Sequence, residues 1–291
     1  MTKDNQGNGF FQRDAPLVGE GEIFASLAEN RGSSLFLGRF SMTEVLAVMN
    51  KRSFLRDARK RGFLPLEFEL DSSGHPLQRL TIYSRSAKPE NMIVDLKIKE
   101  GDYAPKSADL PGFPRGQQKC LFLEWLTLQN PNLAFSGKTS PLPGQMYPGL
   151  NLSKKIMDIF IYLARLIHKD GLLAFPAYFH NALLFSRYFR FVNPEKEGEV
   201  RAVRAFFSHV PFKQLAWIVH FGSLKNAEGT PLEWKSEEQM FALSRPLRDY
   251  FDSRGYKERV KSAMKGRGFV VDWDAFNKKS RELPLCGQGF F

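Results

Sequence analysis

The chain contains little cysteine and little histidine. Its 291 residues include two cysteines, Cys120 and Cys286, and five histidines. Two cysteines cannot build a disulfide-rich scaffold or a four-cysteine zinc site. Four of the histidines show no metal-ligand spacing with one another or with the cysteines, namely His75, His168, His209 and His220. We therefore expect no bound metal, and the reducing cytoplasm is the expected location.

Long apolar runs are also absent from the sequence. No stretch of about 18 uninterrupted apolar residues occurs, so no transmembrane helix is expected. The N-terminal stretch MTKDNQGNGFFQRDAP is polar and lacks the apolar centre of a secretory signal peptide. Both absences favour a cytoplasmic protein.

Apolar and basic side chains, by contrast, are abundant. Hydrophobic residues make up 43% of the chain, which is enough to bury a full core. The net charge of +11 favours a negatively charged partner, which leaves nucleic acid, anionic lipid, a polyanionic cofactor or an acidic protein. The basic run from Lys257 to Arg267 could contact phosphates, but no nucleic-acid-binding signature accompanies it. Solvated surface side chains are the simpler interpretation of that run.

Hydrophobic periodicity predicts a strand meander followed by a helical region. Residues 1–31 are expected to form a flexible lead-in, residues 32–195 the main domain, and residues 196–291 a mainly helical C-terminal extension. Inside the main domain we expect a strand near Ser34–Phe40 and one or two helices over Thr43–Lys60. The SSGHP segment predicts a hairpin, and NMIVDLKIKE predicts a further strand. The pattern of FKQLAWIVHFG fits either a helix or a strand.

The stretch from Cys120 to Val192 predicts a strand–loop–helix–strand–helix–strand unit. Its first strand, CLFLEWLTLQN, carries one carboxylate, Glu124. The helix LSKKIMDIFIYLARLIHKD joins this strand to LLAFP, so the two strands should be parallel. That helix is apolar around most of its circumference, which predicts a largely buried helix. Asn151 or Ser153 is expected to cap its start, and Gly171 is expected to end it.

A Pro/Gly-rich loop, SGKTSPLPGQMYPGLN, leads into this helix. It places Gly149 just before a helix start that carries Lys154 and Lys155. Unpaired backbone N–H groups and the positive end of the helix dipole favour an anion at such a point. The loop is therefore a candidate phosphate cradle at the carboxyl end of the strands. An ordinary helix start with two solvated lysines explains the same residues.

This order of elements resembles the GNAT superfamily of N-acyltransferases, which bind acyl-CoA. The family loop signature is Q/R-x-x-G-x-G/A, and its positions fall on Met146, Gly149 and Asn151, with Gln145 beside the first. Only the first glycine of the signature is present. The resemblance covers roughly Ser34 to Asn193. It implies an α+β fold, namely a GNAT-like mixed sheet with a central splayed parallel strand pair, followed by a helical C-terminal extension.

The same resemblance implies roles for particular residues. Glu124 would act through water as the base toward an acceptor amine. Phe185 occupies the place of the family's late tyrosine, so Tyr188, three residues on, would protonate the leaving thiolate. The residues expected to bind the cofactor are Gln145, Gly149, Leu150, Asn151, Ser153, Lys154 and Lys155, and those expected in the acceptor pocket are His180 and Asn181. The simpler interpretations are a solvent-facing carboxylate, a core tyrosine and first-turn caps.

We therefore expect an N-acyltransferase that needs no metal. It would move an acyl group to an amine from acyl-CoA, or from the phosphopantetheine thioester of an acidic acyl carrier protein. The incomplete motifs leave open a catalytically inactive acyl-CoA-binding module. The net charge leaves open a basic protein that binds nucleic acid or an anionic surface.

Overall fold

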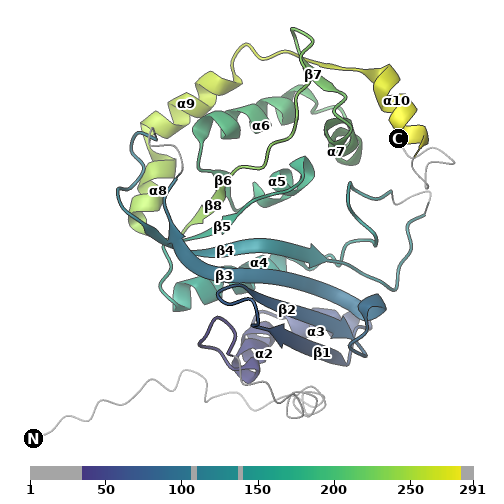
Figure 1. Cartoon of the computed structure of the whole chain (residues 1–291), viewed down its shortest axis with the longest axis vertical. Helices are drawn as coiled ribbons and strands as arrows, with labels where there is room; N and C mark the ends of the chain where they lie inside the picture. Colours follow the sequence, from purple (N-terminus) through teal and green to yellow (C-terminus); the bar gives the residue numbers. More distant parts are fainter. Residues whose placement is uncertain (1–34, 106–109, 137–139, 283–291) are drawn as a thin grey trace, which may run out of the picture.

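A seven-stranded mixed sheet forms the centre of the computed structural model, which describes residues 35–105, 110–136 and 140–282 (Figure 1). The strand order is β1-β2-β3-β4-β5-β8-β6, and only β4 and β5 are parallel neighbours. The strands are β1 (Leu66–Asp71), β2 (Gln78–Ser84), β3 (Met92–Tyr103), β4 (Gln118–Leu128), β5 (Gly171–Ala174), β6 (Arg190–Phe191) and β8 (Gln239–Ala242). The expected α+β class and its central parallel pair are thus confirmed. The expected lead-in over residues 1–31 and Cys286 lie outside the described residues.

The N-terminal part of the described chain matches the predicted meander in most respects. The hairpin pairs β1 with β2, and two helices precede it, α2 (Met42–Lys51) and α3 (Phe54–Lys60). The strand expected at Ser34–Phe40 is wrong. Residues 35–40 instead form a tight turn closed by a bridge between Phe36 and Phe40, because Leu37 and Gly38 have positive φ angles of 53° and 61°.

The predicted long helix is α4 (Ser153–Leu166), which connects β4 to β5. Its apolar face is buried as expected. The predicted ends are wrong, however. The N-cap residue is Leu152 and no side chain caps the helix, because Asn151 turns away with a φ of +57°. At the other end His168 takes the positive φ, and Gly171 begins β5, where a β-carbon would lie only 3.1 Å from the Phe241 carbonyl oxygen.

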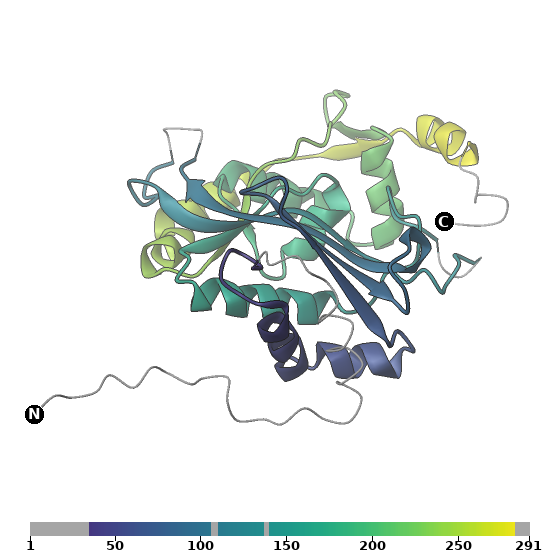
Figure 2. The same cartoon turned by 60° about the horizontal axis from the view of Figure 1, so that its bottom comes forward.

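Helices cover both faces of the sheet, but unevenly. One apolar core joins α2, α3 and α4 to one face, and the purple and teal helices of Figure 2 lie along that side. A second core packs α8 (Arg245–Asp252) and α9 (Arg254–Met264) onto the opposite face near the start of β4. A third core is formed by α5 (Phe179–Phe185), α6 (Pro194–Phe206) and α7 (Phe212–His220) with the small β7–β9 sheet. The FKQLAWIVHFG segment is therefore helical.

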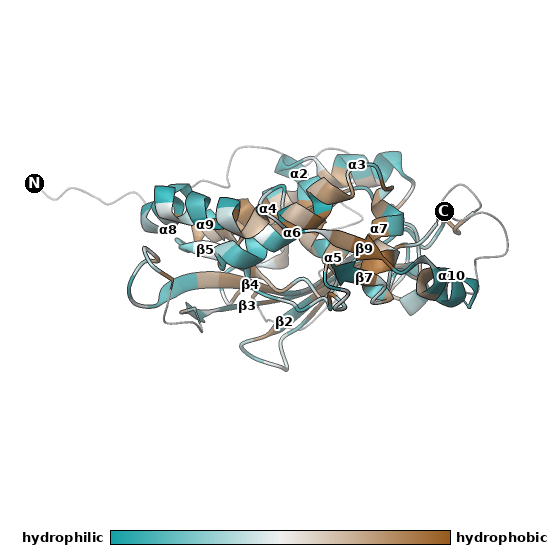
Figure 3. Cartoon of the chain, turned by 90° about the horizontal axis from the view of Figure 1, so that it is seen from above, coloured by the Kyte–Doolittle hydropathy of each residue, from teal (hydrophilic) through white to brown (hydrophobic). Residues whose placement is uncertain are grey.

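The C-terminal region is mainly helical and still contributes to the main sheet. Strand β8 lies between β5 and β6, although it follows both in the sequence. The boundary expected near residue 195 therefore separates segments that share one sheet. The remaining elements are β7 (Leu224–Asn226), β9 (Phe269–Val271), α10 (Trp273–Arg281) and the short 3-10 helix Pro89–Asn91. Helices α8 and α10 show mostly hydrophilic colour, as expected for helices on the surface (Figure 3).

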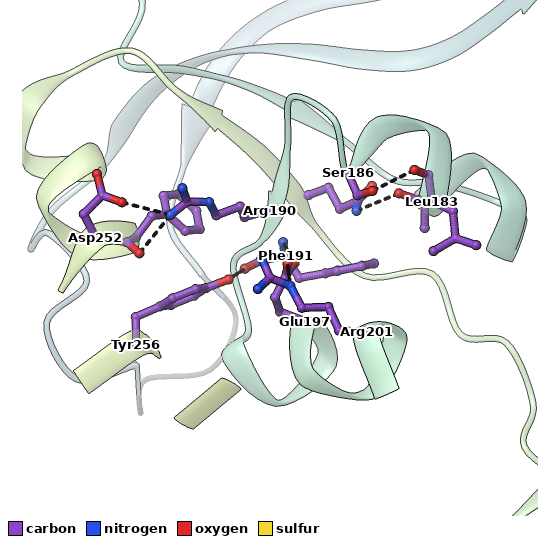
Figure 4. Close-up of polar contacts among 11 residues, drawn as sticks. Leu183, Ser186, Arg190, Phe191, Glu197, Arg201, Asp252 and Tyr256 are labelled. Carbon is purple, nitrogen blue, oxygen red and sulfur yellow. Dashed lines mark hydrogen bonds and ion pairs between the residues drawn. The ribbon is translucent and has the colours of Figure 1, made fainter. Parts of the chain in front are cut away.

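Strand β6 is only two residues long, and side chains from three helices hold it in place (Figure 4). The buried Glu197 carboxylate accepts from the backbone N–H of Phe191 at 2.8 Å and from Arg201 Nε at 2.7 Å. The hydroxyl of Tyr256 donates to the Phe191 carbonyl at 2.7 Å. Arg190 Nη1 contacts Asp252 at 3.1 Å. These contacts fix α6, α8 and α9 relative to the sheet.

Candidate functional site

The parallel strands β4 and β5 stop pairing halfway along β4. The last paired residues are Leu123 and Ala174, whereas β4 continues to Leu128. Among the described residues, no strand pairs with β4 on this side over residues 124–127. Pairing resumes one step further, where Gln129 bridges Gly149 and the Leu150 N–H donates to the Leu128 carbonyl at 3.2 Å. The free stretch of backbone is therefore a gap bounded at both ends by hydrogen bonds.

A cavity of about 330 Å³ lies at this gap, and we call it the cleft. Its walls are the second half of β4, the loop over residues 142–147 and the segment over residues 175–185 that runs into α5. Four of the predicted site residues line it, namely Glu124, Gln145, His180 and Asn181. These four residues lie up to 57 positions apart in the chain, and the fold brings them together in one cleft.

Glu124 occupies a β-bulge in β4. Leu123 pairs with Ile98 and Trp125 pairs with Lys97, so Glu124 is the extra residue. Bulges re-aim side chains and occur next to active sites. The Glu124 carboxylate lies 2.6 Å from Lys99 Nζ and its side chain is 31% exposed. Glu124 is thus neither a core carboxylate nor a free one, because it lines the cleft while it is already paired with a cation.

His180 is the buried polar group of the cleft. It is 4% exposed, and its Nδ1 has no hydrogen-bond partner within the described residues. The ring of Tyr178 stacks on it with centroids 5.3 Å apart. Burial, and next the charge of His220, lower the pKa of His180 to about 4. The imidazole is therefore neutral at pH 7, and its unpartnered nitrogen is available for a ligand.

The loop that faces His180 is held by its own polar contacts. Gln145 Oε1 accepts from the Leu142 N–H at 2.9 Å. Gly144 has a φ of +77°, and a β-carbon at that position would lie 2.6 Å from the Tyr178 hydroxyl. The loop therefore packs directly on Tyr178. Met146, at the position of the family's Gln or Arg, is 81% exposed.

The predicted phosphate cradle lies beside the cleft, not in its wall. Gly149 is part of the bridge to Gln129, and Leu150 is buried in the core, so both would act only through backbone groups. The start of α4 has no side-chain cap, which leaves the first-turn N–H groups of Ser153, Lys154 and Lys155 unbonded by any cap.

Basic side chains lie near that helix start, and one of them is close to a carboxylate. Arg61, which follows α3, donates from Nη2 to the Asn151 carbonyl at 3.4 Å. Lys155 Nζ lies 3.9 Å from Asp57. Arg61 is a candidate residue that the sequence did not reveal, because it is 90 positions away from Asn151 and only the packing of α3 beside α4 brings it there.

Tyr188 lies outside the walls of the cleft. It packs against the core that joins α4 to the sheet, and burial, followed by the charge of Asp158, raises its pKa. Tyr178 and Phe175 do line the cleft, and the sequence prediction missed both. Both residues follow β5 at its carboxyl end, and that position was the available signal.

Comparisons with known proteins identify no family for the chain. No protein family model matches it. No curated protein matches it either. Among solved structures it is similar to one described as the crystal structure of AtaTR bound with AcCoA, at 13% identity and a TM-score of 0.26, over 54% of this chain and 80% of that one. A TM-score this low carries no argument about fold or function.

Two further findings concern the described residues only. None of their helices is long and apolar enough to cross a membrane. No group of three His, Cys, Asp or Glu side chains among them could hold a metal ion. The buried Cys120 lies near the start of β4, and burial raises the pKa of its thiol to about 12, which disfavours the reactive thiolate.

Proposed function

We propose that the protein is an N-acyltransferase that moves an acyl group from acyl-CoA, or another phosphopantetheine thioester, to an amine. The observation that carries this proposal is the interruption of the β4–β5 pair beside an uncapped helix start. A phosphopantetheine arm is extended and carries two amides. Its amides match the free backbone of residues 124–127, because an unpaired strand edge offers N–H and C=O groups in the same spacing.

The helix start would hold the phosphates of the donor. Unbonded N–H groups of the first turn and the dipole of α4 attract an anion. Arg61 lies at the same point, and Lys154 and Lys155 belong to the first turn, where Lys155 is also 3.9 Å from Asp57. Gly149 would let the phosphates of the donor come close to the backbone. Nothing in the described structure requires glycine at this position, because the nearest atom to an added β-carbon would be 4.0 Å away.

The chemistry would be direct transfer within the cleft. The neutral amine attacks the thioester carbonyl, the C–N bond forms, the C–S bond breaks, and the amine proton ends on the departing thiol. Backbone N–H groups at the Glu124 bulge would stabilise the oxyanion. Glu124, acting through water, would accept the amine proton. Tyr178 lines the cleft and Tyr188 does not, so we propose that Tyr178 donates the proton to the departing thiolate.

A non-catalytic acyl-CoA-binding module is the second candidate. The ion pair between Lys99 and Glu124 favours it, because Lys99 Nζ, 2.6 Å away, already occupies the carboxylate that would have to act as the base. Both proposals predict stabilisation by CoA. Release of free thiol from acetyl-CoA in the presence of amines distinguishes them, since only the enzyme produces thiol.

We further propose that an acidic acyl carrier protein in the cytoplasm is a donor. Exposed basic residues at the end of α3, near the helix start of the cradle, would guide its docking. The Lys257–Arg267 run contributes less charge than its sequence suggests, because Arg259 is paired with Glu195 and Arg267 with Glu199. A comparison of transfer rates from carrier-bound and CoA-bound donors at low salt tests this choice, and equal or faster use of acyl-CoA would contradict it.

A further inference from the structure

A second cavity of about 360 Å³ adjoins the cleft through a shared wall residue, Phe175. Its other walls come from the end of β3, the segment after β6 and the segment before β8. Phe175 directly follows the last residue of β5 that pairs with β4. A molecule in this second cavity therefore lies next to the point where the strands part.

The second cavity is acidic, although the chain as a whole is basic. Its described lining includes three carboxylates, Glu195, Glu237 and Glu238, and one guanidinium, that of Arg259. Arg259 is fully engaged, since its Nε and Nη2 donate to both oxygens of Glu195 at 2.7 and 2.9 Å. Among the described residues, Glu237 and Glu238 have no cation partner. In a chain with a net charge of +11, such a cavity selects for a positively charged ligand.

The two remaining carboxylates differ in their surroundings. Glu237 accepts a neutral hydrogen bond from Asn193 Nδ2 at 3.1 Å. Glu238 is held by its backbone, whose carbonyl accepts from the Val192 N–H at 2.9 Å, so its position is fixed independently of its side chain. Neither carboxylate is in an ion pair within the described residues.

A buried hydroxyl in the same cavity points to a ligand independently of the charges. Tyr103 is 6% exposed, and its hydroxyl has no hydrogen-bond partner within the described residues. The ring is packed edge-on against Phe113, at 6.2 Å between centroids. Burial, and next the charge of Glu238, raise the pKa of Tyr103, so the hydroxyl is neutral and lies in the field of that carboxylate. A buried polar group without a partner is costly unless a ligand meets it.

We propose that this acidic cavity binds a positively charged group of the acyl acceptor, and that the preferred acceptor is therefore an amine with a second basic group. Glu237, Glu238 and the Tyr103 hydroxyl would accept hydrogen bonds from the charged group. The neutral amine at the other end would pass Phe175 to reach the thioester in the cleft. This inference rests on the proposed acyltransferase function, and it names the class of acceptor: diamines and basic amines of similar length.

The test compares 1,5-diaminopentane with 1,5-pentanediol, a chain of equal length that carries no charge. Calorimetry on the donor-free protein should show that the diamine binds at least about tenfold more tightly at constant ionic strength, because one charge-assisted contact is gained. Glu238→Gln should remove about tenfold of that affinity. Glu258→Gln is the matched control, since Glu258 is exposed on α9, pairs with Arg254 and does not line the cavity.

Tyr103→Phe separates binding from folding. Its hydroxyl makes no hydrogen bond to any described residue, so its removal should leave the melting temperature unchanged or higher while the diamine binds more weakly. Equal affinity for diamine and diol, or equal effects of Glu238→Gln and Glu258→Gln, would overturn the inference. If CoA binds and the diamine does not, the acidic cavity alone is misassigned. If the diamine binds at Glu238 while neither CoA nor acetyl-CoA binds, the acyltransferase proposal fails and the acceptor role with it.

Discussion

The ammonium group of Lys99 lies 2.6 Å from the carboxylate of Glu124, the bulge residue of β4 that lines the cleft. This pairing decides how Glu124 can act. As long as the ion pair persists, Lys99 occupies the carboxylate. An acceptor amine or a water molecule that displaces Lys99 would release it. Lys99 Nζ also lies 5.5 Å from the centroid of the Phe122 ring, so the same ammonium group contacts two side chains of β4 at once.

Replacement of Glu124 tests the proposed base. Glu124→Gln should lower the rate of acyl transfer by about 10²–10⁴ and leave CoA binding unchanged, because a general base is removed without a change of shape. The measurement is the rate of acyl transfer as a function of pH, for the wild-type protein and for Glu124→Gln. Glu69→Gln, on the exposed side of β1, is the control. An unchanged pH–rate profile in Glu124→Gln would remove Glu124 from the mechanism.

Gly149→Val tests the phosphate cradle. The added side chain finds open space in the free protein, with the nearest atom 4.0 Å from the β-carbon, so the fold should persist. The same side chain would occupy the approach to the α4 start. We expect a near-normal melting temperature without ligand and a loss of most stabilisation by CoA. Retention of full CoA stabilisation would place the phosphates elsewhere.

Two glycines in helices should respond oppositely to alanine. A β-carbon at Gly198 in α6 would lie 2.5 Å from the Ala263 β-carbon and 2.6 Å from the Val260 carbonyl oxygen. Gly198→Ala should therefore destabilise the protein by about 1–3 kcal/mol, because backbone of α9 must move. Gly255→Ala meets no atom within 4 Å and should stabilise by about 0.4–1 kcal/mol. Denaturant unfolding of both variants measures the difference, and equal effects would contradict the close α6–α9 packing.

The stability of the protein should fall on acidification, and His180 should account for part of the fall. Its pKa is lowered from 6.5 to about 4, so the unfolded chain binds a proton between these values and the folded protein does not. The stability that depends on a neutral His180 is therefore fully present above pH 6.5. It is lost as the pH falls toward 4, to a total of about 3 kcal/mol of unfolding free energy. Unfolding free energies of His180→Gln should vary less over this interval than those of wild type. The exposed His75→Gln serves as control, and parallel curves for all three proteins would contradict the assignment.

The sequence predicted best where local pattern decides the structure. The alternation in β1 to β4, the amphipathic α4 and the helical crossover between β4 and β5 all follow from residues near one another in the chain. Glu124, His180 and Asn181 could be placed at one end of the sheet for the same reason.

Other features depended on contacts between distant segments. Strand β8 lies between β5 and β6 in the sheet, although it comes about 50 residues after β6 in the chain. No local sequence pattern predicts that position. The start of α4 uses Leu152, where Asn151 offered a standard cap, because the chain must first pair with β4 through Gly149. Arg61 and the acidic cavity arise in the same way, from segments brought together only by packing.

The thermal stability of the wild-type protein with and without acetyl-CoA tests the central claim most directly. If the interrupted strand pair and the α4 start bind a phosphopantetheine thioester, acetyl-CoA at about 100 times its dissociation constant should add about 2.7 kcal/mol to the free energy of unfolding, and Gly149→Val should lose most of that gain. An unchanged melting temperature of the wild-type protein with both CoA and acetyl-CoA would contradict the claim.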